Sequence, residues 1–308
     1  MSRLTHSQGG FIRSLQMSSA SVFAFVEGRL DRPFFDRLLD QVCGLKGLKH
    51  QVIAMKELPG ETGGKSRLLS TFQTFRKQGL LMSLAFGKKM ACIFLADKDA
   101  DDYCLRKLRS AHLIYSPSYD LEGHLFTCGN LQRALADSSG ITLQQAQLLI
   151  PDPEAWLMNV AEKWKDWISL CLISQRGKVN CGCTFDRISA INADPLAPAS
   201  VHKLEHFKNA LAVALGVTSD RFEQIYSTTY RRVEASLNAG KPMKYFKGKW
   251  LSYLMQKFLE AKPRPADADF NGIGERLGIT LVAQVAVHAN CKCCNPYAAQ
   301  VSKLVAHL

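Results

Sequence analysis

The chain has 308 residues, of which 47% are hydrophobic, and a formal net charge of +12. This length is enough for two domains with a sizeable core, and the hydrophobic share excludes a disordered chain. The basic excess predicts a polyanionic partner, most simply a nucleic acid. Residues 1–150 carry nineteen Lys and Arg against thirteen Asp and Glu, and residues 151–308 carry twenty against fourteen. The charge therefore belongs to the folded body and not to a tail.

Cysteine content and the absence of targeting signals indicate the compartment. The first twenty residues lack the apolar core of a signal peptide, and no apolar run is long enough to span a bilayer. Ten cysteines without a signal peptide are more typical of reduced thiols or metal ligands than of disulfides. We therefore expect a cytoplasmic protein that does not interact with a membrane.

Strand and helix patterns alternate up to about residue 128. The expected strands are 21–27, 50–55, 90–97 and 111–116. The expected helices are 33–43, 64–79 and a short one within 99–110. This alternation predicts an α/β fold with a mostly parallel sheet flanked by helices, in which ligand sites lie beyond the carboxyl ends of the strands.

Beyond residue 128 the pattern becomes helical. The expected helices are 154–171, 201–215, 219–237 and 250–261, and residues 173–200 are expected to form a long loop. Apolar residues in the first of these helices recur at spacings of three and four, which predicts a buried face: Trp156, Val160, Trp164, Trp167 and Cys171. The sequence thus predicts an α/β domain over 18–128. A largely α-helical part over 129–308 would bind substrate, a partner or both.

Two of the expected strands end in acidic residues. Glu27 ends the first, and the third ends in a cluster formed by Asp97, Asp99, Asp101 and Asp102. Carboxylates at this density repel one another unless a cation or protons offset the repulsion. Carboxylate oxygens without neighbouring His or Cys favour Mg²⁺ or Mn²⁺, and the candidate ligands are Glu27, Asp97, Asp99 and Asp101. Capping of a helix N-terminus is an alternative role for the last two acids of the cluster.

The order of these acidic motifs resembles the TOPRIM domain, the metal-dependent catalytic core of topoisomerases, primases and several nucleases. The first motif is Val26-Glu27-Gly28 with Asp31, and the second is Leu95-Ala96-Asp97-Lys98-Asp99. The resemblance covers roughly residues 20–128. It implies acid–base or metal chemistry for Glu27 and Mg²⁺ coordination by Asp97 and Asp99.

A third segment, YSPSYDLEGHLF, narrows the resemblance. Its Tyr119, Asp120 and Glu122 are similar to a Tyr-x-[Ile/Leu]-Glu segment of OLD-like TOPRIM nucleases, and in particular of the AriB effectors of PARIS anti-phage defence. This resemblance implies that Glu122 is a further catalytic acid. It also implies tRNA cleavage, a toxic effector role, an AriA-like ABC-type ATPase as partner, and a homodimer as the active form. The alternatives are an OLD-like DNA nuclease and a non-catalytic subunit that binds nucleic acid or the ATPase.

Two basic segments are candidate nucleic-acid contacts. The turn over residues 59–66 nearly matches a P-loop, but Pro59 replaces its first glycine, so we expect Lys65 to contact a phosphate or simply to open a helix. In residues 228–257 aromatic residues are interleaved with basic ones, a pattern typical of RNA binding. The candidates there are Arg231, Arg232, Lys244, Lys247 and Lys249. An acidic protein surface is the alternative partner.

The cysteines of the second half have an unusual spacing. C-x-C and C-x-C-C differ from the C-x-x-C pairs of most structural zinc sites. The possible ligands are Cys181, Cys183, Cys291, Cys293 and Cys294. A structural Zn²⁺ site is therefore the less favoured interpretation, and buried or reactive thiols are the more favoured one.

Overall fold

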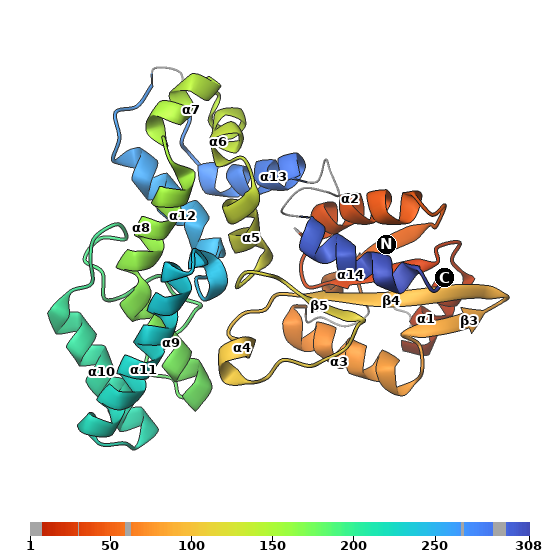
Figure 1. Ribbon diagram of the computed structural model, residues 1–308, viewed down its shortest axis with the longest axis horizontal. Coiled ribbons are helices and arrows are strands. Elements are labelled where there is room, and N and C mark those ends of the chain that lie inside the picture. The colour runs from red at the N-terminus through yellow and green to blue at the C-terminus, as the bar shows by residue number, and fades with distance from the viewer. Residues whose placement is uncertain (1–7, 30, 59–62, 266–267, 286–293) are drawn as a thin grey trace, which may run out of the picture. The chain divides into compact units, whose positions relative to one another are not determined.

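The computed structural model describes residues 8–29, 31–58, 63–265, 268–285 and 294–308 (Figure 1). The chain divides into two compact units. The first comprises Met1–Asp97, Leu108–Ser116 and Val282–Leu308, and the second comprises Lys98–Lys107 and Pro117–Leu281. This division differs from the expected boundary after residue 128, because three separate stretches of the sequence enter the first unit.

A mixed sheet of five strands forms the centre of the first unit. The strands are β1 (Val22–Val26), β2 (His50–Ala54), β3 (Met82–Ala85), β4 (Lys88–Ala96) and β5 (Leu113–Tyr115). The order is β2-β1-β4-β3, and β5 also pairs with β4. All pairs are parallel except β3 with β4. Strand β1 pairs with one edge of β4. The other edge of β4 is shared: β3 pairs with its first half and β5 with its end. The expected α/β architecture is confirmed.

Helices cover both faces of this sheet. They are α1 (Gln8–Met17), α2 (Asp31–Gly44), α3 (Lys65–Lys77) and α14 (Asn295–Val305), with a 3₁₀ turn η1 at Met55–Glu57. Figure 1 shows α2 and α14 on one side of the sheet and α3 on the other. Alternate strand residues face α1 and α3, where Phe25 stacks on Phe94 at 4.7 Å between ring centroids and Phe75 packs edge-on against both. This aromatic cluster forms the core of the first unit.

Strand β3 is an element that the sequence analysis did not predict. It forms a hairpin with β4 through Phe86 and Gly87, whose φ angles are +50° and +76°. Positive φ at both central residues suits the right-handed twist of a two-residue hairpin, and it normally selects Asn-Gly or Asp-Gly. Because Phe86 occupies the first position, the sequence lacks the dipeptide that usually predicts such a turn.

The second unit is helical. Its helices are α4 (Asp101–Cys104), α5 (Leu121–Cys128), α6 (Leu131–Ser139), α7 (Leu143–Leu149), α8 (Pro153–Lys163), α9 (Lys165–Gly177), α10 (Val201–Leu215), α11 (Ser219–Asn238), α12 (Lys249–Glu260) and most of α13 (Ile273–Val285), with a 3₁₀ turn η2 at Pro242–Lys244. The expected helical second half is confirmed. No helix among the described residues combines the length and apolarity needed to cross a membrane.

The tryptophan-rich face predicted for residues 154–171 is buried, as expected for core. The segment forms two helices instead of one, because Trp164 leaves helical geometry with ψ of 4° and ends α8. Its indole N–H donates to the Pro195 carbonyl at 2.8 Å, and its ring packs against Trp250. Helix α9 continues to Gly177, so the expected loop begins later, at residue 178.

We expect Phe94→Ala to lower the free energy of unfolding by about 3–5 kcal/mol, because it leaves a cavity among the packed rings. Leu84→Ala is the matched control, since Leu84 is exposed on β3 and its loss changes stability by about 0.5 kcal/mol or less. Urea unfolding followed by circular dichroism measures both. Equal losses for the two variants would contradict the assignment of the core.

Candidate functional site

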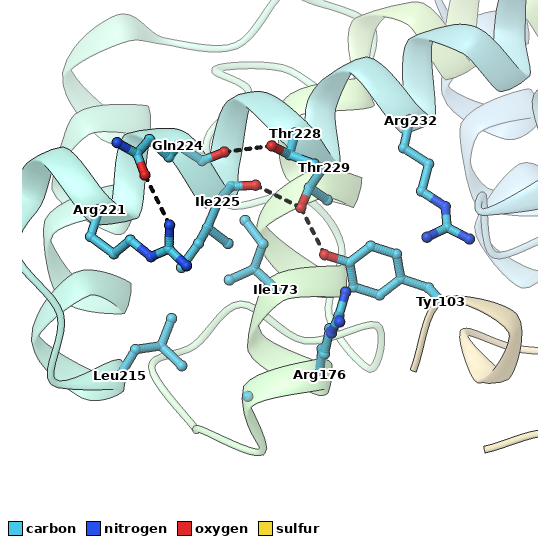
Figure 2. A pocket seen from close by; sticks show the side chains of 11 residues that line it. Tyr103, Ile173, Arg176, Leu215, Arg221, Gln224, Ile225, Thr228, Thr229 and Arg232 are labelled. Carbon is cyan, nitrogen blue, oxygen red and sulfur yellow. Dashed lines mark hydrogen bonds between the residues drawn. The ribbon is translucent and has the colours of Figure 1, made fainter. Parts of the chain in front are cut away.

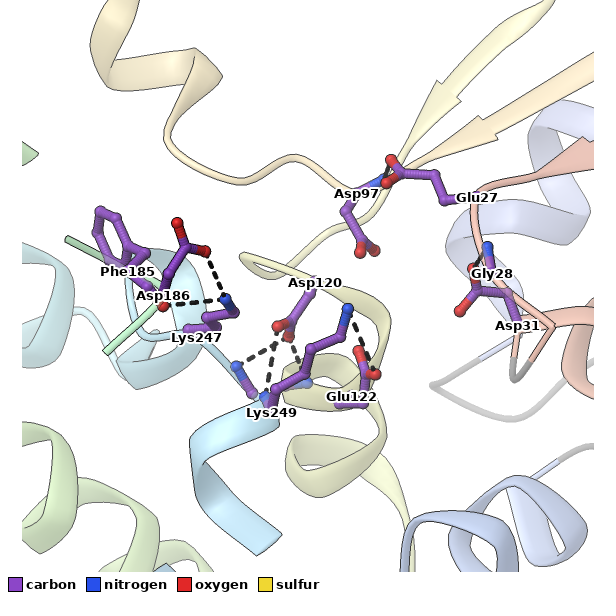
Figure 3. A network of polar contacts seen from close by, with 12 residues as sticks. Glu27, Gly28, Asp31, Asp97, Asp120, Glu122, Phe185, Asp186, Lys247 and Lys249 are labelled. Atoms are coloured by element: carbon purple, nitrogen blue, oxygen red, sulfur yellow. Dashed lines mark hydrogen bonds and ion pairs between the residues drawn. The ribbon is translucent and has the colours of Figure 1, made fainter. Parts of the chain in front are cut away.

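Glu27 and Asp97 follow the ends of two paired parallel strands. In the register of β1 and β4, Val26 lies opposite Leu95, so the residues after both strands lie at the carboxyl edge of the sheet. The backbone N–H of Asp97 donates to Oε1 of Glu27 at 2.8 Å (Figure 3). The structure thus brings together the first two predicted acids, which are seventy residues apart in sequence.

The Glu27–Asp97 hydrogen bond fixes the position of the Glu27 carboxylate. A carboxylate offers about four lone-pair sites, so it can accept a backbone N–H and also contact a cation or a proton donor. Both residues are only partly buried. The turn that follows is held by Asp31, whose Oδ2 accepts the backbone N–H of Gly28 at 2.8 Å. The first acidic motif therefore builds the turn between β1 and α2 and presents Glu27 at its start.

The remaining acids of the cluster belong to the second unit. Asp99 has a φ of +49°, and its N–H donates to the Tyr119 carbonyl at 2.6 Å. Asp101 and Asp102 lie in the first turn of α4, where the helix dipole favours acids, and Asp102 pairs with Lys107 at 3.3 Å. Ala100 is the N-cap and no side chain caps α4, so the structure supports the dipole part of the capping alternative and not a cap hydrogen bond.

Lys98 lies between Asp97 and Asp99 in sequence, and the sequence analysis gave it no role. It is buried, and its Nζ donates to the Pro117 carbonyl at 2.6 Å. Burial lowers the pKa of Lys98 to about 8, since desolvation disfavours the charged amine. The order Asp97-Lys98-Asp99 in the sequence could have indicated this role, because a lysine between two carboxylates balances their charge.

Asp120 connects two helix N-termini in the second unit. Its buried carboxylate caps α5 by accepting the N–H of Gly123 at 2.8 Å, and it also accepts the N–H groups of Gly248 at 2.9 Å and Lys249 at 3.4 Å, where α12 begins (Figure 3). Burial, and next the nearby charge of Glu122, raise the pKa of Asp120 to about 7. A Cβ on Gly248 would lie 1.9 Å from the Gly123 nitrogen, so only glycine permits this approach.

Glu122 carries a carboxylate oxygen without a donor. Oε2 is buried and has no hydrogen-bond partner among the described residues, while Oε1 lies 3.9 Å from Nζ of Lys249. A buried acceptor without a partner costs about 1–3 kcal/mol, more if it is charged. Such an oxygen is suited to accept a proton or to bind a cation, which supports the role that the sequence analysis gave Glu122.

The predicted basic residues differ in what they contact. Lys247 donates to the Phe185 carbonyl at 2.9 Å and pairs with Asp186 at 3.6 Å, so it holds the loop before α10 (Figure 3). Lys244 lies 5.1 Å from the ring centroid of Tyr245, and Lys65 lies 5.7 Å from that of Tyr115. The Lys65 contact is within the first unit, at the start of α3.

The remaining basic residues are exposed, whereas the interleaved aromatic residues are buried. Lys249 and Arg231 are exposed, and Arg232 is exposed with its Nε–H donating to the Tyr245 hydroxyl at 3.1 Å. The aromatic residues of this segment are buried in the second unit, and they are Tyr245, Phe246 and Trp250. These rings are therefore not available for the base stacking by which aromatic residues commonly bind RNA, because they are buried among other side chains.

One further group of side chains has metal-binding geometry. Ligand atoms of Asp36, Asp40 and His50 all lie within 4.8 Å of one another, and they could hold a metal ion. His50 begins β2 opposite Val22 at the start of β1, so the group lies at the amino ends of these strands, away from Glu27. The spacing of the two aspartates by four residues on α2 was visible in the sequence, but their proximity to His50 requires the sheet.

The cysteines provide no support for zinc. Among the described residues no three cysteines come close enough to share an ion, and Cys291 and Cys293 lie outside those residues. Burial raises the pKa of Cys171 and Cys183 well above the ordinary thiol value.

The fold and the acids define an α/β protein with carboxylates just beyond the carboxyl ends of two parallel strands. Comparison with known proteins adds no family: no family model matches the chain, and no curated protein matches it.

We expect Asp120→Ala to lower the free energy of unfolding by about 2–4 kcal/mol, because it leaves buried N–H groups of two helix starts without an acceptor. Asp152→Ala is the control, since Asp152 is an exposed cap of α8 with one acceptor contact, to Ala155, and its loss costs about 1 kcal/mol. Thermal and urea unfolding of both variants measure the difference. Equal destabilisation would refute the connecting role of Asp120.

Proposed function

We propose that the protein is a Mg²⁺-dependent endonuclease that cleaves the phosphodiester backbone of a nucleic acid. The observation that carries this proposal is the Glu27 carboxylate held by the Asp97 amide at the carboxyl edge of a largely parallel sheet. That edge is where α/β proteins bind ligands. Partial burial and a fixed position suit an acid that must bind metal or move a proton.

Hard oxygen ligands make Mg²⁺ or Mn²⁺ the fitting cofactor. We assign Glu27 and Asp97, which are hydrogen-bonded within the first unit, as ligands. The sequence motifs alone add Asp99, Asp101 and Glu122 of the second unit to the proposed set of acids. A divalent ion bound by Glu27 and Asp97 would stabilise negative charge that develops on a phosphodiester oxygen. The Asp36, Asp40 and His50 group is the competing location, and its histidine suits transition metals better than Mg²⁺.

In this mechanism the residues of the chain position a water and move a proton. The Asp97 N–H holds one oxygen of Glu27, and a carboxylate fixed in this way can accept the proton of an attacking water. Lys98 neutralises part of the surrounding negative charge when it is protonated. Removal of a general base typically lowers the rate about 10²–10⁴-fold.

The resemblance of the motifs to OLD-like TOPRIM nucleases suggests a substrate, a biological role and a partner. We infer RNA, and tRNA in particular, as the substrate, and the net charge of +12 supports a polyanion. In this proposal the protein is a toxic effector of anti-phage defence, restrained by an AriA-like ABC-type ATPase and active in the cytoplasm as a homodimer. DNA as substrate is the alternative that the cleavage assay distinguishes.

The first test is cleavage of total tRNA and of plasmid DNA with Mg²⁺ or Mn²⁺. We expect the wild type to cut tRNA, EDTA to abolish cutting, and Glu27→Gln to lower the rate at least about 100-fold. Glu154→Gln is the control, since Glu154 is an exposed acid on α8.

Each alternative has its own result in this assay. Cleavage of DNA but not RNA would favour an OLD-like DNA nuclease. If neither is cut, and wild type and Glu27→Gln are equally harmless in cells with a partner ATPase and a phage, the catalytic proposal is abandoned for a binding subunit.

A second test locates the metal. Electron paramagnetic resonance measures the free Mn²⁺ that remains in the presence of each variant. We expect Asp97→Asn and Glu122→Gln to weaken Mn²⁺ binding by tenfold or more, because each removes a charged oxygen ligand, whereas Asp36→Asn leaves it unchanged. Weakening by Asp36→Asn alone would move the ion to the group formed with Asp40 and His50.

A further inference from the structure

A cavity of about 570 Å³ opens within the second unit, between α4, α9, the end of α10 and α11 (Figure 2). Three arginines line it: Arg176 from α9, and Arg221 and Arg232 from α11. No aspartate or glutamate is among its lining residues. None of the three arginines forms an ion pair with an acid of the described residues, although such pairs are frequent elsewhere in this unit. Three guanidinium groups that line one cavity without an acid form a local excess of positive charge, which an anion would offset.

The cavity wall holds two of these arginines in place. The Tyr103 hydroxyl is hydrogen-bonded to Oγ1 of Thr229 at 2.7 Å, and both side chains are buried. The guanidinium groups of Arg176 and Arg232 each lie 5.4 Å from the centroid of the Tyr103 ring, which lies between them in Figure 2. These cation–π contacts position the charges without neutralising them.

Hydrogen bonding leaves the terminal nitrogens of Arg232 available. Its Nε–H donates to the buried Tyr245 hydroxyl at 3.1 Å, which fixes the plane of the guanidinium. That is the one hydrogen bond of Arg232 among the described residues, so both terminal NH₂ groups can form the parallel pair of bonds that arginine makes with phosphate. Arg221 is oriented by Gln224, to which its Nη1 donates at 2.9 Å.

Part of the remaining lining is apolar and suits an organic group, beside the polar side chains of Gln224, Thr228 and Thr229. Ile173, Leu215 and Ile225 contribute side chains to the cavity beside the arginines. Volumes of about 300–1,000 Å³ with an apolar wall and a few fixed polar groups are typical of small-molecule sites. A single inorganic phosphate would leave most of this cavity unfilled, whereas a nucleotide offers both a dianionic phosphate and an apolar ring.

We propose that this cavity binds the phosphate monoester of a nucleotide, either free or at the end of a nucleic-acid strand. Arg232, whose terminal nitrogens are available, contacts the phosphate, Arg176 and Arg221 attract it through their charge, and the apolar side chains contact the base or sugar. This binding does not depend on the proposed nuclease activity, because every lining residue belongs to the second unit and none of the candidate metal ligands is among them.

Isothermal titration calorimetry in EDTA tests the proposal with the whole chain. The ligands are adenosine 5′-monophosphate, adenosine, and a short oligonucleotide with and without a 5′-phosphate. We expect each phosphorylated ligand to bind at least tenfold more tightly than its unphosphorylated counterpart, since charge-assisted bonds to phosphate are the strong ones. EDTA keeps metal-dependent cleavage out of the measurement, so failure of the nuclease proposal leaves this result interpretable.

Matched variants assign the binding to the cavity. Arg176→Ala, and Arg232→Lys, which keeps the charge but loses the planar fork, are expected to weaken binding about tenfold or more. Arg133→Ala is the control, since Arg133 is exposed on α6 and pairs with Asp137 away from the lining residues. Circular dichroism and melting temperature confirm that each variant is folded. Affinity should also fall between pH 7 and pH 5, because the second ionisation of a phosphate monoester lies near pH 6 while arginine stays charged.

Three results would overturn the proposal: equal binding of phosphorylated and unphosphorylated ligands, equal effects of Arg176→Ala and Arg133→Ala, or no loss of affinity toward pH 5. The ligands also distinguish the two sources of the phosphate. Tighter binding of the monophosphate than of the phosphorylated oligonucleotide supports a free nucleotide, and the reverse order supports a strand end.

Discussion

The parallel pairing of β1 with β4 is the constraint on which the candidate site depends. Without this pairing, Glu27 and Asp97 would be unrelated residues of a long chain. With it, the two strands end at one edge, and the amide of one acid donates to the carboxylate of the other. The pairing is stabilised by the aromatic cluster beneath it, because Phe25 of β1 stacks directly on Phe94 of β4. Packing on one face of the sheet therefore positions carboxylates at its edge.

In the second unit, the buried carboxylate of Asp120 has a comparable organising role. Asp120 receives N–H groups from the starts of both α5 and α12, and the close approach requires Gly248. A fully buried carboxyl would be unfavourable without these donors. Because Asp120 caps α5, it also fixes the position of Glu122, which lies two residues later in the first turn. The unpartnered oxygen of Glu122 is thus held by a rigid support, as binding and catalytic groups require.

Local periodicity predicted the fold class and the buried tryptophan face, since apolar spacing records which side of an element is covered. It did not predict β3, where Phe86 occupies a turn position that usually selects asparagine, or the break at Trp164, where packing outweighs helix propensity. Motif order indicated Glu27 and Asp97, because strand ends can be read locally. Arg176 and Tyr103 could not be associated with α11 in this way, since only the packed helices bring them together.

Charge alone was a poor guide to which basic residues face a ligand. Lys247 belongs to the most basic segment of the sequence, yet it is occupied by a backbone carbonyl and by Asp186. Arg176 lies outside the most basic segment of the sequence, yet it lines a cavity that contains no acids. Lys247 and Arg176 differ in their contacts. The charge of Lys247 is already compensated by a carbonyl and a carboxylate, whereas Arg176 has no acid as partner among the described residues. Positive charge that remains uncompensated after folding, and not basic composition, therefore indicates where this protein can bind an anion.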